Sequence, residues 1–297
     1  MSKVVAVGLG EVLWDVLDHG RKLGGAPANF AFQVNSLGGR GLPVSRVGDD
    51  DLGREALQIL RANDLDTACV TLDPDHPTGT VLAKLDAAGQ ANYVFPADVA
   101  WDFLTVNDAA RRIAPDVDAV CFGTLAQRSA VSRAAVREFL GLAPAAALKV
   151  FDVNLRGDFY SRELIEESLG LATVLKVSDA ELPVLAKMFE LPGDDRGQLA
   201  ALVQRFALDL AALTRGAAGS LLVARDAASD HPGLTTEVVD TIGAGDAFTA
   251  AMVLGICKGW SLGQVNERAN QVAAFVCSQA GAMAVAPAEL RVTGPGS

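Results

Sequence analysis

Short apolar runs recur along this chain, and stretches with a helical pattern separate most of them. The runs with the length and composition of buried strands lie at residues 4–7, 119–122, 150–153, 174–177, 210–213 and 220–223. The helical patterns cover residues 26–37, 51–62, 129–140, 162–169, 179–188, 196–206, 245–258 and 262–279. Strands that alternate with helices are joined by right-handed crossovers and become parallel neighbours. The order therefore predicts an α/β fold with one doubly wound, mainly parallel sheet.

Two segments, residues 11–23 and 78–95, interrupt this alternation. Asp18-His19-Gly20 predicts a turn in the first segment, and Ala88-Gly89 predicts a turn in the second. Both segments have the pattern of hairpins that lie outside the main sheet. Because no long linker, repeat or low-complexity stretch divides the chain, we expect a single domain over residues 1–297 with these two segments inserted as a small extra sheet.

The chain is acidic, with a net charge of −11 and a pI near 4.7. Most of its surface would repel a nucleic-acid backbone or an anionic membrane, so neither is an expected partner. A nucleotide is compatible with this charge, because backbone N–H groups, a helix N-terminus and Mg²⁺ supply local positive potential. No run reaches ~18 apolar residues, no basic and apolar leader is present, and the four cysteines form no C-x-x-C pair. These features favour a cytoplasmic location with reduced thiols.

The most informative segment is residues 238–248, where an apolar run breaks into Gly243-Ala244-Gly245-Asp246 before a helix. Side chains this small let backbone N–H groups approach phosphate oxygens, toward which the helix directs its positive end. Asp246 would then lie beside a phosphoryl group, where a carboxylate can take a proton from an attacking hydroxyl. The alternative is structural: a first-turn carboxylate worth ~0.3–1 kcal/mol with the helix dipole, after glycines that only make a turn.

Two separated signatures resemble those of one family. Residues 240–246 (DTIGAGD) closely resemble the C-terminal signature of the ribokinase-like, or phosphofructokinase B, carbohydrate kinases. Residues 24–31 (GGAPANFA), followed by Leu37-Gly38-Gly39, resemble the N-terminal signature, and residues 47–53 resemble the next landmark. The resemblance covers nearly the whole chain. It implies a three-layer α/β/α sandwich with a small β lid, and an enzyme that uses ATP and Mg²⁺ to phosphorylate a sugar.

The resemblance also implies roles for single residues. The anion hole and the catalytic base match four consecutive residues: Gly243, Ala244, Gly245 and Asp246. The sugar site matches residues 11–30, where Asp15 would accept sugar hydroxyls, Gly24 and Gly25 would let the sugar approach the backbone, and Asn29 would donate and accept hydrogen bonds. The plain alternatives are a solvated hairpin position for Asp15 and a helix-surface amide for Asn29.

The composition of the second lid segment indicates which class of sugar the site could bind. From residue 85 to residue 107 there is no Lys or Arg, while Asn92 and Trp101 are available for amide and stacking contacts. This composition favours a neutral sugar over one with a carboxylate or phosphate. An exposed lid face could also pair two subunits, so a homodimer is a further expectation.

Two further stretches concern the phosphates and the metal. Residues 152–156 (DVNLR) resemble a stretch of fructokinases and keto-deoxy-gluconate kinases, and Arg156 offers a planar fork to a phosphoryl or sugar oxygen. In residues 176–181, Glu181 matches a glutamate near the Mg²⁺ waters and Lys176 is expected to contact the nucleotide. Ser178 stands where the family often has asparagine. Arg156 in a helix-entry ion pair, and Glu181 as a surface helix acid, are the alternatives.

The remaining expectations concern the base of the nucleotide and a monovalent cation. Four residues are expected near the nucleotide: Thr214, Gly216, Gly219 and Asn270. Without the signatures, residues 214–219 would be an ordinary glycine hairpin. By the resemblance, K⁺ would bind beside the anion hole through Asp240 and the carbonyl of Ile242, although Gln279 replaces an arginine common in the family.

Other nucleotide-binding motifs are missing. Residues 7–10 (VGLG) begin a dinucleotide fingerprint, but Leu13 occupies the place of the third glycine, and there is no G-x-x-x-x-G-K-[ST] loop. His19, His76 and His231 are too scattered to suggest a metal cage or a triad. A sugar-binding module without catalysis would be expected to carry a damaged base or anion hole, and both are intact.

The sequence therefore predicts an ATP-dependent carbohydrate kinase. Residues 10–15 and 152–156 look more like fructokinases than ribokinases, so fructose is the expected acceptor. Ribose, keto-deoxy-gluconate and nucleosides remain alternatives, since kinases of these substrates share the fold and the base.

Overall fold

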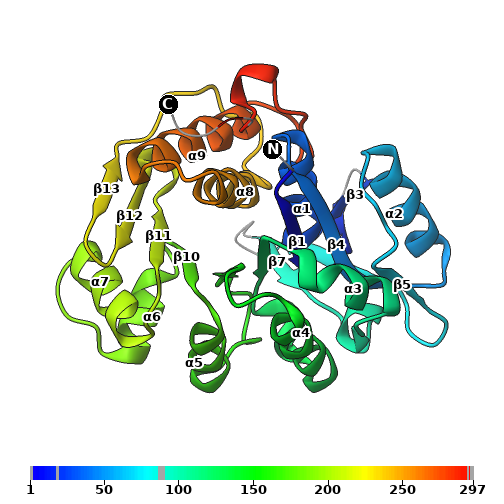
Figure 1. The fold of residues 1–297 in the computed structure, drawn as a ribbon. Helices are drawn as coiled ribbons and strands as arrows, with labels where there is room; N and C mark the ends of the chain where they lie inside the picture. Colours follow the sequence, from blue (N-terminus) through cyan, green and yellow to red (C-terminus); the bar gives the residue numbers. More distant parts are fainter. Residues whose placement is uncertain (1–2, 18–19, 86–90, 293, 295–297) are drawn as a thin grey trace.

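The computed structural model describes residues 3–17, 20–85, 91–292 and 294. Its main sheet has the strand order β13-β12-β11-β10-β9-β8-β1-β4-β5 (Figure 1). The strands are β1 (Val5–Leu9), β4 (Arg40–Gly48), β5 (Val70–Asp73), β8 (Ala119–Phe122), β9 (Leu148–Asp152), β10 (Val174–Ser178), β11 (Leu210–Thr214), β12 (Ser220–Ala224) and β13 (Ala228–His231). Neighbours are parallel except in the pairs β11–β12 and β12–β13. The predicted doubly wound, mainly parallel sheet is confirmed.

Helices cover both faces of this sheet and make three layers (Figure 1). One face carries α1 (Ala26–Ser36), α8 (Ala244–Cys257) and α9 (Leu262–Cys277), and the other carries α3 (Asp108–Ile113), α4 (Ala130–Leu142), α5 (Arg162–Leu171), α6 (Leu182–Phe189) and α7 (Asp195–Arg205). Successive strand residues enter opposite cores: Ala6 and Cys121 pack with α1 and α8, whereas Val7 and Phe122 pack with α4. Helix α2 (Asp51–Ala62) shares a third core with α1. The 3₁₀ helices are η1 (Ala100–Phe103), η2 (Ala114–Asp116), η3 (Leu125–Arg128), η4 (Gly216–Ala218) and η5 (Ala288–Leu290).

The eight expected helices are present, but the sequence patterns missed three strands and one helix. Strand β4 contains Pro43, β5 and β13 have only four residues each, and α3 is a short helix of six. Helix α6 begins at Leu182 rather than at residue 179, because Pro183 occupies its first turn and the Glu181 carboxylate accepts from the N–H group of Ser178 before the helix (2.8 Å).

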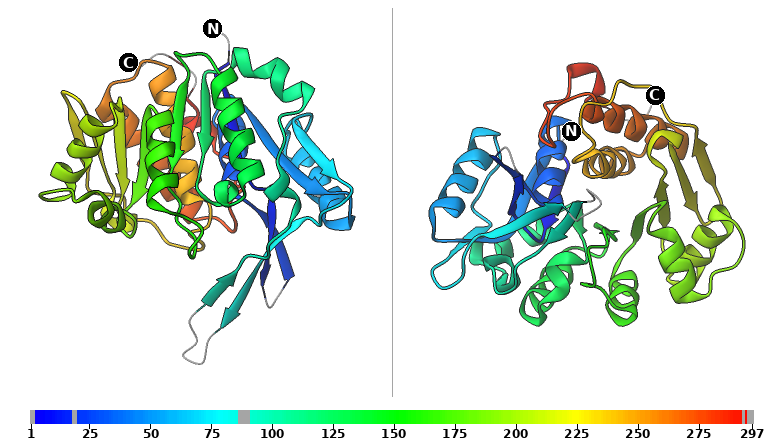
Figure 2. Two further views of the ribbon diagram at one scale, coloured as in Figure 1. Left: turned by 90° about the horizontal axis from the view of Figure 1, so that it is seen from below. Right: turned by 180° about the vertical axis from the view of Figure 1, so that it is seen from behind.

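The two interrupting segments form a second sheet with the order β3-β2-β6-β7, which we call the lid. Its strands are β2 (Leu13–Leu17), β3 (Gly20–Gly24), β6 (Gly79–Leu85) and β7 (Ala91–Val94). Each segment is an antiparallel hairpin, and a parallel β2–β6 ladder joins the two. The lid projects from the main body (Figure 2, left). The expected turns at Asp18-His19-Gly20 and Ala88-Gly89 fall largely on residues 18–19 and 86–90, outside the described residues.

The structure also bears on the expectations about membrane-spanning segments and about reduced cysteines. Among the described residues, none of the helices combines the length and the apolar composition needed to cross a bilayer. The four cysteines are free thiols, and Cys69 and Cys121 are buried.

Candidate active site

A cavity lies at the carboxyl ends of the central parallel strands, where the first turn of α8 meets them. Its lining includes Glu11, Pro27, Phe122, Asp152, Asp246 and Thr249. These residues follow β1, begin α1, end β8 and β9, and begin α8. Ligands of doubly wound sheets bind at this edge, so the topology brings the sequence-predicted base to the expected place.

The glycine loop before α8 leaves backbone donors unpaired. Gly243 is the N-cap of α8 with a φ of 79°, and a Cβ on it would lie 2.4 Å from the Ala282 Cβ. The N–H group of Ala244 donates back to a carbonyl of the loop at 3.3 Å, whereas the N–H groups of Gly245 and Asp246 have no acceptor among the described residues. Two backbone donors and the positive end of α8 therefore converge on one point, as an anion hole requires.

Asp246 lies half-buried in the first turn of α8. One of its oxygens accepts a hydrogen bond from the Asn29 side-chain amide at 2.9 Å. Burial, and after it the nearby Asp152 charge, raise the pKa of Asp246 from 3.8 to about 6, against the opposing effects of Asn29, Lys176 and Arg156. A carboxylate with a pKa close to the working pH is suited to general base catalysis.

A buried lysine lies beneath the glycine loop. The Lys176 ammonium donates to an Asp152 carboxylate oxygen at 3.1 Å, and its nitrogen lies 3.1 Å from the position that a Cβ on Gly245 would take. Burial alone would lower the pKa of Lys176, but the carboxylates of Asp152, Glu181 and Asp246 raise it. The lysine therefore stays protonated and adds positive charge beside the loop.

Arg156 is exposed, and among the described residues its guanidinium bonds only to the carbonyl of Leu155, at 3.0 Å. Its charge opposes the burial-driven rise in the pKa values of Glu11, Asp15 and Asp246, so it acts on the same site. An exposed guanidinium without a carboxylate partner is available for a phosphoryl oxygen.

The residues predicted to bind the sugar lie on the lid, on the turn after it and on α1. Asp15 on β2 occupies space that a side chain on Gly24 would need, since a Cβ there would lie 2.5 Å from an Asp15 oxygen. Gly25 has a φ of 107°, and a Cβ on it would meet the Glu11 carbonyl at 2.4 Å. The second side-chain atom of Asn29, its Oδ1, is buried without a partner in the described structure and can accept from a substrate hydroxyl.

Asn92 and Trp101 are the two residues that were predicted to contact the sugar from the lid. Asn92 pairs with Lys84 in the β6–β7 ladder, and its side chain is outside the described part. Trp101 lies in η1, is 1% exposed, and carries the Arg128 guanidinium 4.0 Å above its ring centroid. In this conformation the ring packs beneath the lid, so a stacking role would need Arg128 to move.

Two carboxylates are candidates for cation contacts. Glu181 accepts from the N–H groups of Leu155 (2.9 Å) and Ser178 (2.8 Å), which fixes its position. Asp240 accepts from Ile242 (3.0 Å) and from the loop at residue 281, and it forms an ion pair with Lys22 of β3 at 3.4 Å. Among the described residues there is no cluster of three or more His, Cys, Asp or Glu that could hold a metal.

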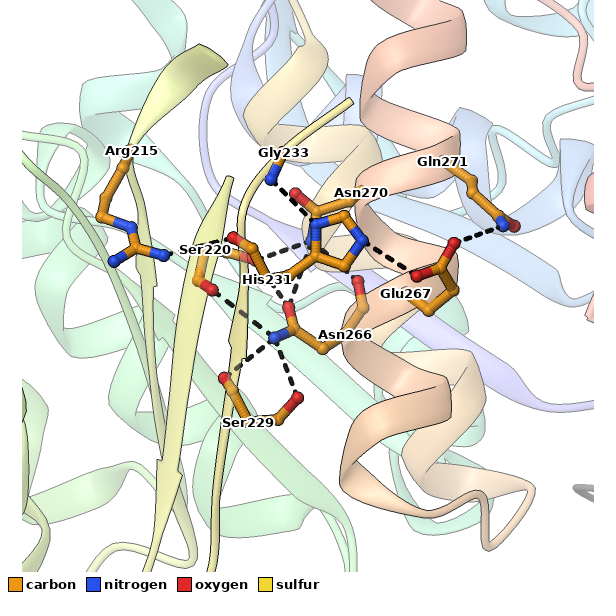
Figure 3. A network of polar contacts seen from close by, with 9 residues as sticks. All are labelled: Arg215, Ser220, Ser229, His231, Gly233, Asn266, Glu267, Asn270 and Gln271. Carbon is orange, nitrogen blue, oxygen red and sulfur yellow. Dashed lines mark hydrogen bonds and ion pairs between the residues drawn. The ribbon is translucent and has the colours of Figure 1, made fainter. Parts of the chain in front are cut away.

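The predicted nucleotide floor is a tight turn braced by a polar network (Figure 3). Thr214, Gly216 and Gly219 form the β11–β12 connection, and a Cβ on Gly219 would lie 2.1 Å from the His231 carbonyl. The Asn270 amide donates to the Ser220 hydroxyl at 2.7 Å and is thereby held against this turn.

His231 connects the backbone at Gly233 to Glu267 on α9 through hydrogen bonds. Its Nδ1 accepts from the N–H group of Gly233 at 3.0 Å, so its Nε2 carries the proton and donates to Glu267 at 2.9 Å (Figure 3). Sequence reasoning gave no role to His231, because its partners are 2 and 36 residues away and no spacing rule connects them.

Sequence reasoning gave no individual role to Glu11 or Thr249. Glu11 was included only as the first residue of the 11–23 and 11–30 segments and in a comparison with fructokinases, although an acid directly after a buried strand end was a usable signal. Thr249 donates to the Gly245 carbonyl at 2.9 Å and closes the first turn of α8. Nothing in its helical neighbourhood marks it as part of the site.

The chain resembles known sugar kinases over nearly its whole length. It is 32% identical over 268 residues to a sugar kinase of Pyrococcus horikoshii (87% of this chain, 82% of that one) and 32% identical over 260 residues to a fructokinase of Klebsiella pneumoniae (84% and 83%). The solved structure of the P. horikoshii protein with ATP superposes with a TM-score of 0.79 at 29% identity (94% of each chain). A Vibrio cholerae fructokinase solved with fructose, ADP and potassium gives a TM-score of 0.81 at 25% identity (97% of each chain).

The family itself is defined by the match of residues 6–289, which include both signatures, to the pfkB family carbohydrate kinases. Because this match covers most of the chain, the chain belongs to the pfkB family of carbohydrate kinases.

Proposed function

We propose that this chain transfers the γ-phosphoryl group of ATP to a primary hydroxyl of fructose, with Asp246 as the general base. The observation that carries the proposal is the position of Asp246: its half-buried carboxyl group, with a pKa raised to about 6, lies in the first turn of α8 beside two backbone N–H groups that have no acceptor in the described structure. The base and the anion hole are thus adjacent, as in-line transfer needs.

In this mechanism Asp246 takes the proton of the attacking hydroxyl while the N–H groups of Gly245 and Asp246 hold the phosphoryl oxygens. Lys176 beneath the loop and Arg156 at the mouth of the site add positive charge where negative charge develops. Mg²⁺, bound with the nucleotide, would neutralise phosphate charge. Glu181 fits a contact to it through water, because its oxygens are held in place and Mg²⁺ keeps several of its waters.

On the acceptor side, Asp15 and Asn29 would bind sugar hydroxyls while the lid covers the site and excludes water, which suppresses ATP hydrolysis. The nucleotide would lie on the turn that holds Thr214, Gly216 and Asn270. The lid face is also where two subunits would pair. A sugar-bound structure with β2 and β6 far from the sugar would refute the lid, and light scattering would test the dimer.

A monovalent cation beside residues 240–246 belongs to the same proposal. Asp240 and the carbonyl of Ile242 would supply its ligands, and the cation would brace the loop. The Lys22 ammonium already lies 3.4 Å from Asp240, so the activating effect would add to a local positive charge. Turnover should be higher in K⁺ than in Na⁺ at matched ionic strength. Equal rates in K⁺, Na⁺ and tetramethylammonium would refute the cation site.

Fructose is supported by the fructokinase names of several relatives and by a lid segment that has no Lys or Arg between residues 85 and 107. The test is ADP release with MgATP and a panel of fructose, glucose, ribose, keto-deoxy-gluconate and a nucleoside. Fructose should give the highest kcat/KM. A clear preference for keto-deoxy-gluconate, ribose or the nucleoside would replace the acceptor and leave the kinase assignment standing.

A further inference from the structure

Glu11 is a buried acid in the cavity that Asp152 and Asp246 also line. It follows β1, is 4% exposed, and lines the same cavity as Asp246 and Thr249. Among the described residues it forms no ion pair, and its carboxylate receives only the N–H group of its own backbone. A buried carboxyl without a cationic partner is costly, and a glutamine or a leucine would fill the same space at a lower cost. Such an acid points to a function in the site.

The charged groups around Glu11 come from three elements. Asp246 faces it from α8, Asp152 and Arg156 face it from β9 and the loop after it, and the Cys121 thiol lies on β8. From α1 the cavity receives only apolar atoms at residues 26, 27 and 30. Burial, together with the Asp246 and Asp152 charges, raises the pKa of Glu11 from 4.5 to about 7, against the opposing effect of Arg156.

The two carboxyls line the same cavity and can exchange a proton through it. The pKa values of both acids are raised toward neutrality, so Glu11 can hold a proton that Asp246 has taken. The cavity between them has a volume of about 10 Å³, which is room for about one water molecule. One water is enough to pass a proton between two carboxyls that face the same cavity.

We propose that Glu11 is the second proton carrier of this site: it accepts the proton of the sugar hydroxyl from Asp246 and releases it to solvent. The sugar O–H bond breaks as its oxygen bonds to the γ-phosphorus, the bond from that phosphorus to the ADP oxygen breaks, and the proton passes to Asp246. A cavity water then gives one proton to Glu11 while it takes the one from Asp246, so the base is ionised again. This role rests on the proposed role of Asp246 as the base.

The test compares Glu11→Gln, which keeps the shape, with Glu11→Asp, which keeps the acid. For Glu11→Gln we expect kcat at pH 7 to fall by roughly tenfold or more. This loss should be smaller than the ~10²-fold or larger loss that is typical when the primary base is removed. The KM values for ATP and sugar should change by less than about twofold. Its kcat–pH profile should lose the ionisation near 7, whereas Glu11→Asp should retain it. In Glu11→Ala, formate should restore part of the lost turnover.

A structural role would give another result: lower thermal stability and altered KM values, with an unchanged pH profile and no response to formate. The surface variant Glu138→Gln on α4 controls for the chemical change alone. Wild-type kcat and pH dependence in Glu11→Gln would overturn the proposal. Asp246→Asn, assayed in parallel, separates the two roles: if it turns over normally the base assignment fails, and if it is inactive while Glu11→Gln is normal only the proton carrier fails.

Discussion

Replacing Asp246, the proposed base, should make the folded protein more stable. The pKa of Asp246 rises from 3.8 to about 6 on folding, a shift of about two units, and each unit corresponds to 1.36 kcal/mol. Because the folded state favours the protonated acid, the resulting penalty is absent below pH 3.8, grows up to about pH 6 and is complete above it, at about 3 kcal/mol. Asp246→Asn removes the ionisable group and keeps an acceptor for Asn29.

Urea denaturation at two pH values checks this magnitude. The variant should be more stable than wild type by about 3 kcal/mol at pH 8 and by only about 1.6 kcal/mol at pH 5. Asp226→Asn, in the exposed turn between β12 and β13, is the control and should change stability by less than ~0.5 kcal/mol at both. A variant no more stable than wild type at pH 8, or a gain that does not depend on pH, would refute the account of a desolvated base.

The same pKa sets the pH dependence of catalysis. Asp246 must be ionised to accept a proton, so kcat/KM should be constant above pH 6 and should fall about tenfold per unit below it. Initial rates between pH 5 and pH 8 at fixed ionic strength measure the profile. A profile that stays level down to pH 5 would place the base at another residue.

Two further variants test the glycine loop before α8 and the buried ion pair between Arg128 and Asp102. Gly243→Ala should lower the free energy of unfolding by about 1–3 kcal/mol and should lower kcat, because its Cβ would meet that of Ala282 at a positive φ. The control is Gly141→Ala on α4, where a Cβ meets nothing within 4 Å, and this variant should leave activity unchanged. A fully active Gly243→Ala would contradict the argument. Arg128→Ala should cost about 3–5 kcal/mol in urea denaturation, because it leaves a buried carboxylate unpaired, whereas Arg137→Ala, in an exposed ion pair, should cost about 0–1 kcal/mol. Similar losses in the two arginine variants would refute the importance of burial.

Sequence patterns predicted the elements whose signal is local. Alternating apolar runs and helices give the parallel sheet, and the small residues before α8 give the anion loop. Strand β4 was not predicted because Pro43 and polar residues break its apolar pattern, yet its residues 40–44 pair with the whole of β1. Conversely, the apolar pair Val238 and Val239 is not a strand, and these side chains are 60% and 62% exposed. Hydrophobicity alone does not decide whether a segment finds a partner strand.

Contacts that depend on register could not be predicted. Asp152 and Lys176 are 24 residues apart and meet because the β9–β10 ladder pairs these two positions. Trp101 was expected at the sugar, but the packing of Arg128 and Asp102 around it is a tertiary contact with no local signature. The position of Asp246 in the first turn of a helix could be predicted because one local segment determines it, whereas the environment that sets its pKa is assembled from four separate elements.

The ion pair between Lys22 and Asp240 has a consequence for how strongly the binding of one substrate affects the binding of the other. Lys22 lies on the lid strand β3 and Asp240 lies in the loop that leads to α8, 218 residues away. A movement of β3 away from α8 would break this contact, so the proposed binding of sugar under the lid and of nucleotide at the loop would be coupled. Coupling is reciprocal: each ligand changes the affinity of the other by the same factor. Because the Lys22 side chain is half exposed, an ion pair worth ~0–1 kcal/mol limits this factor to about fivefold, and added salt should reduce it.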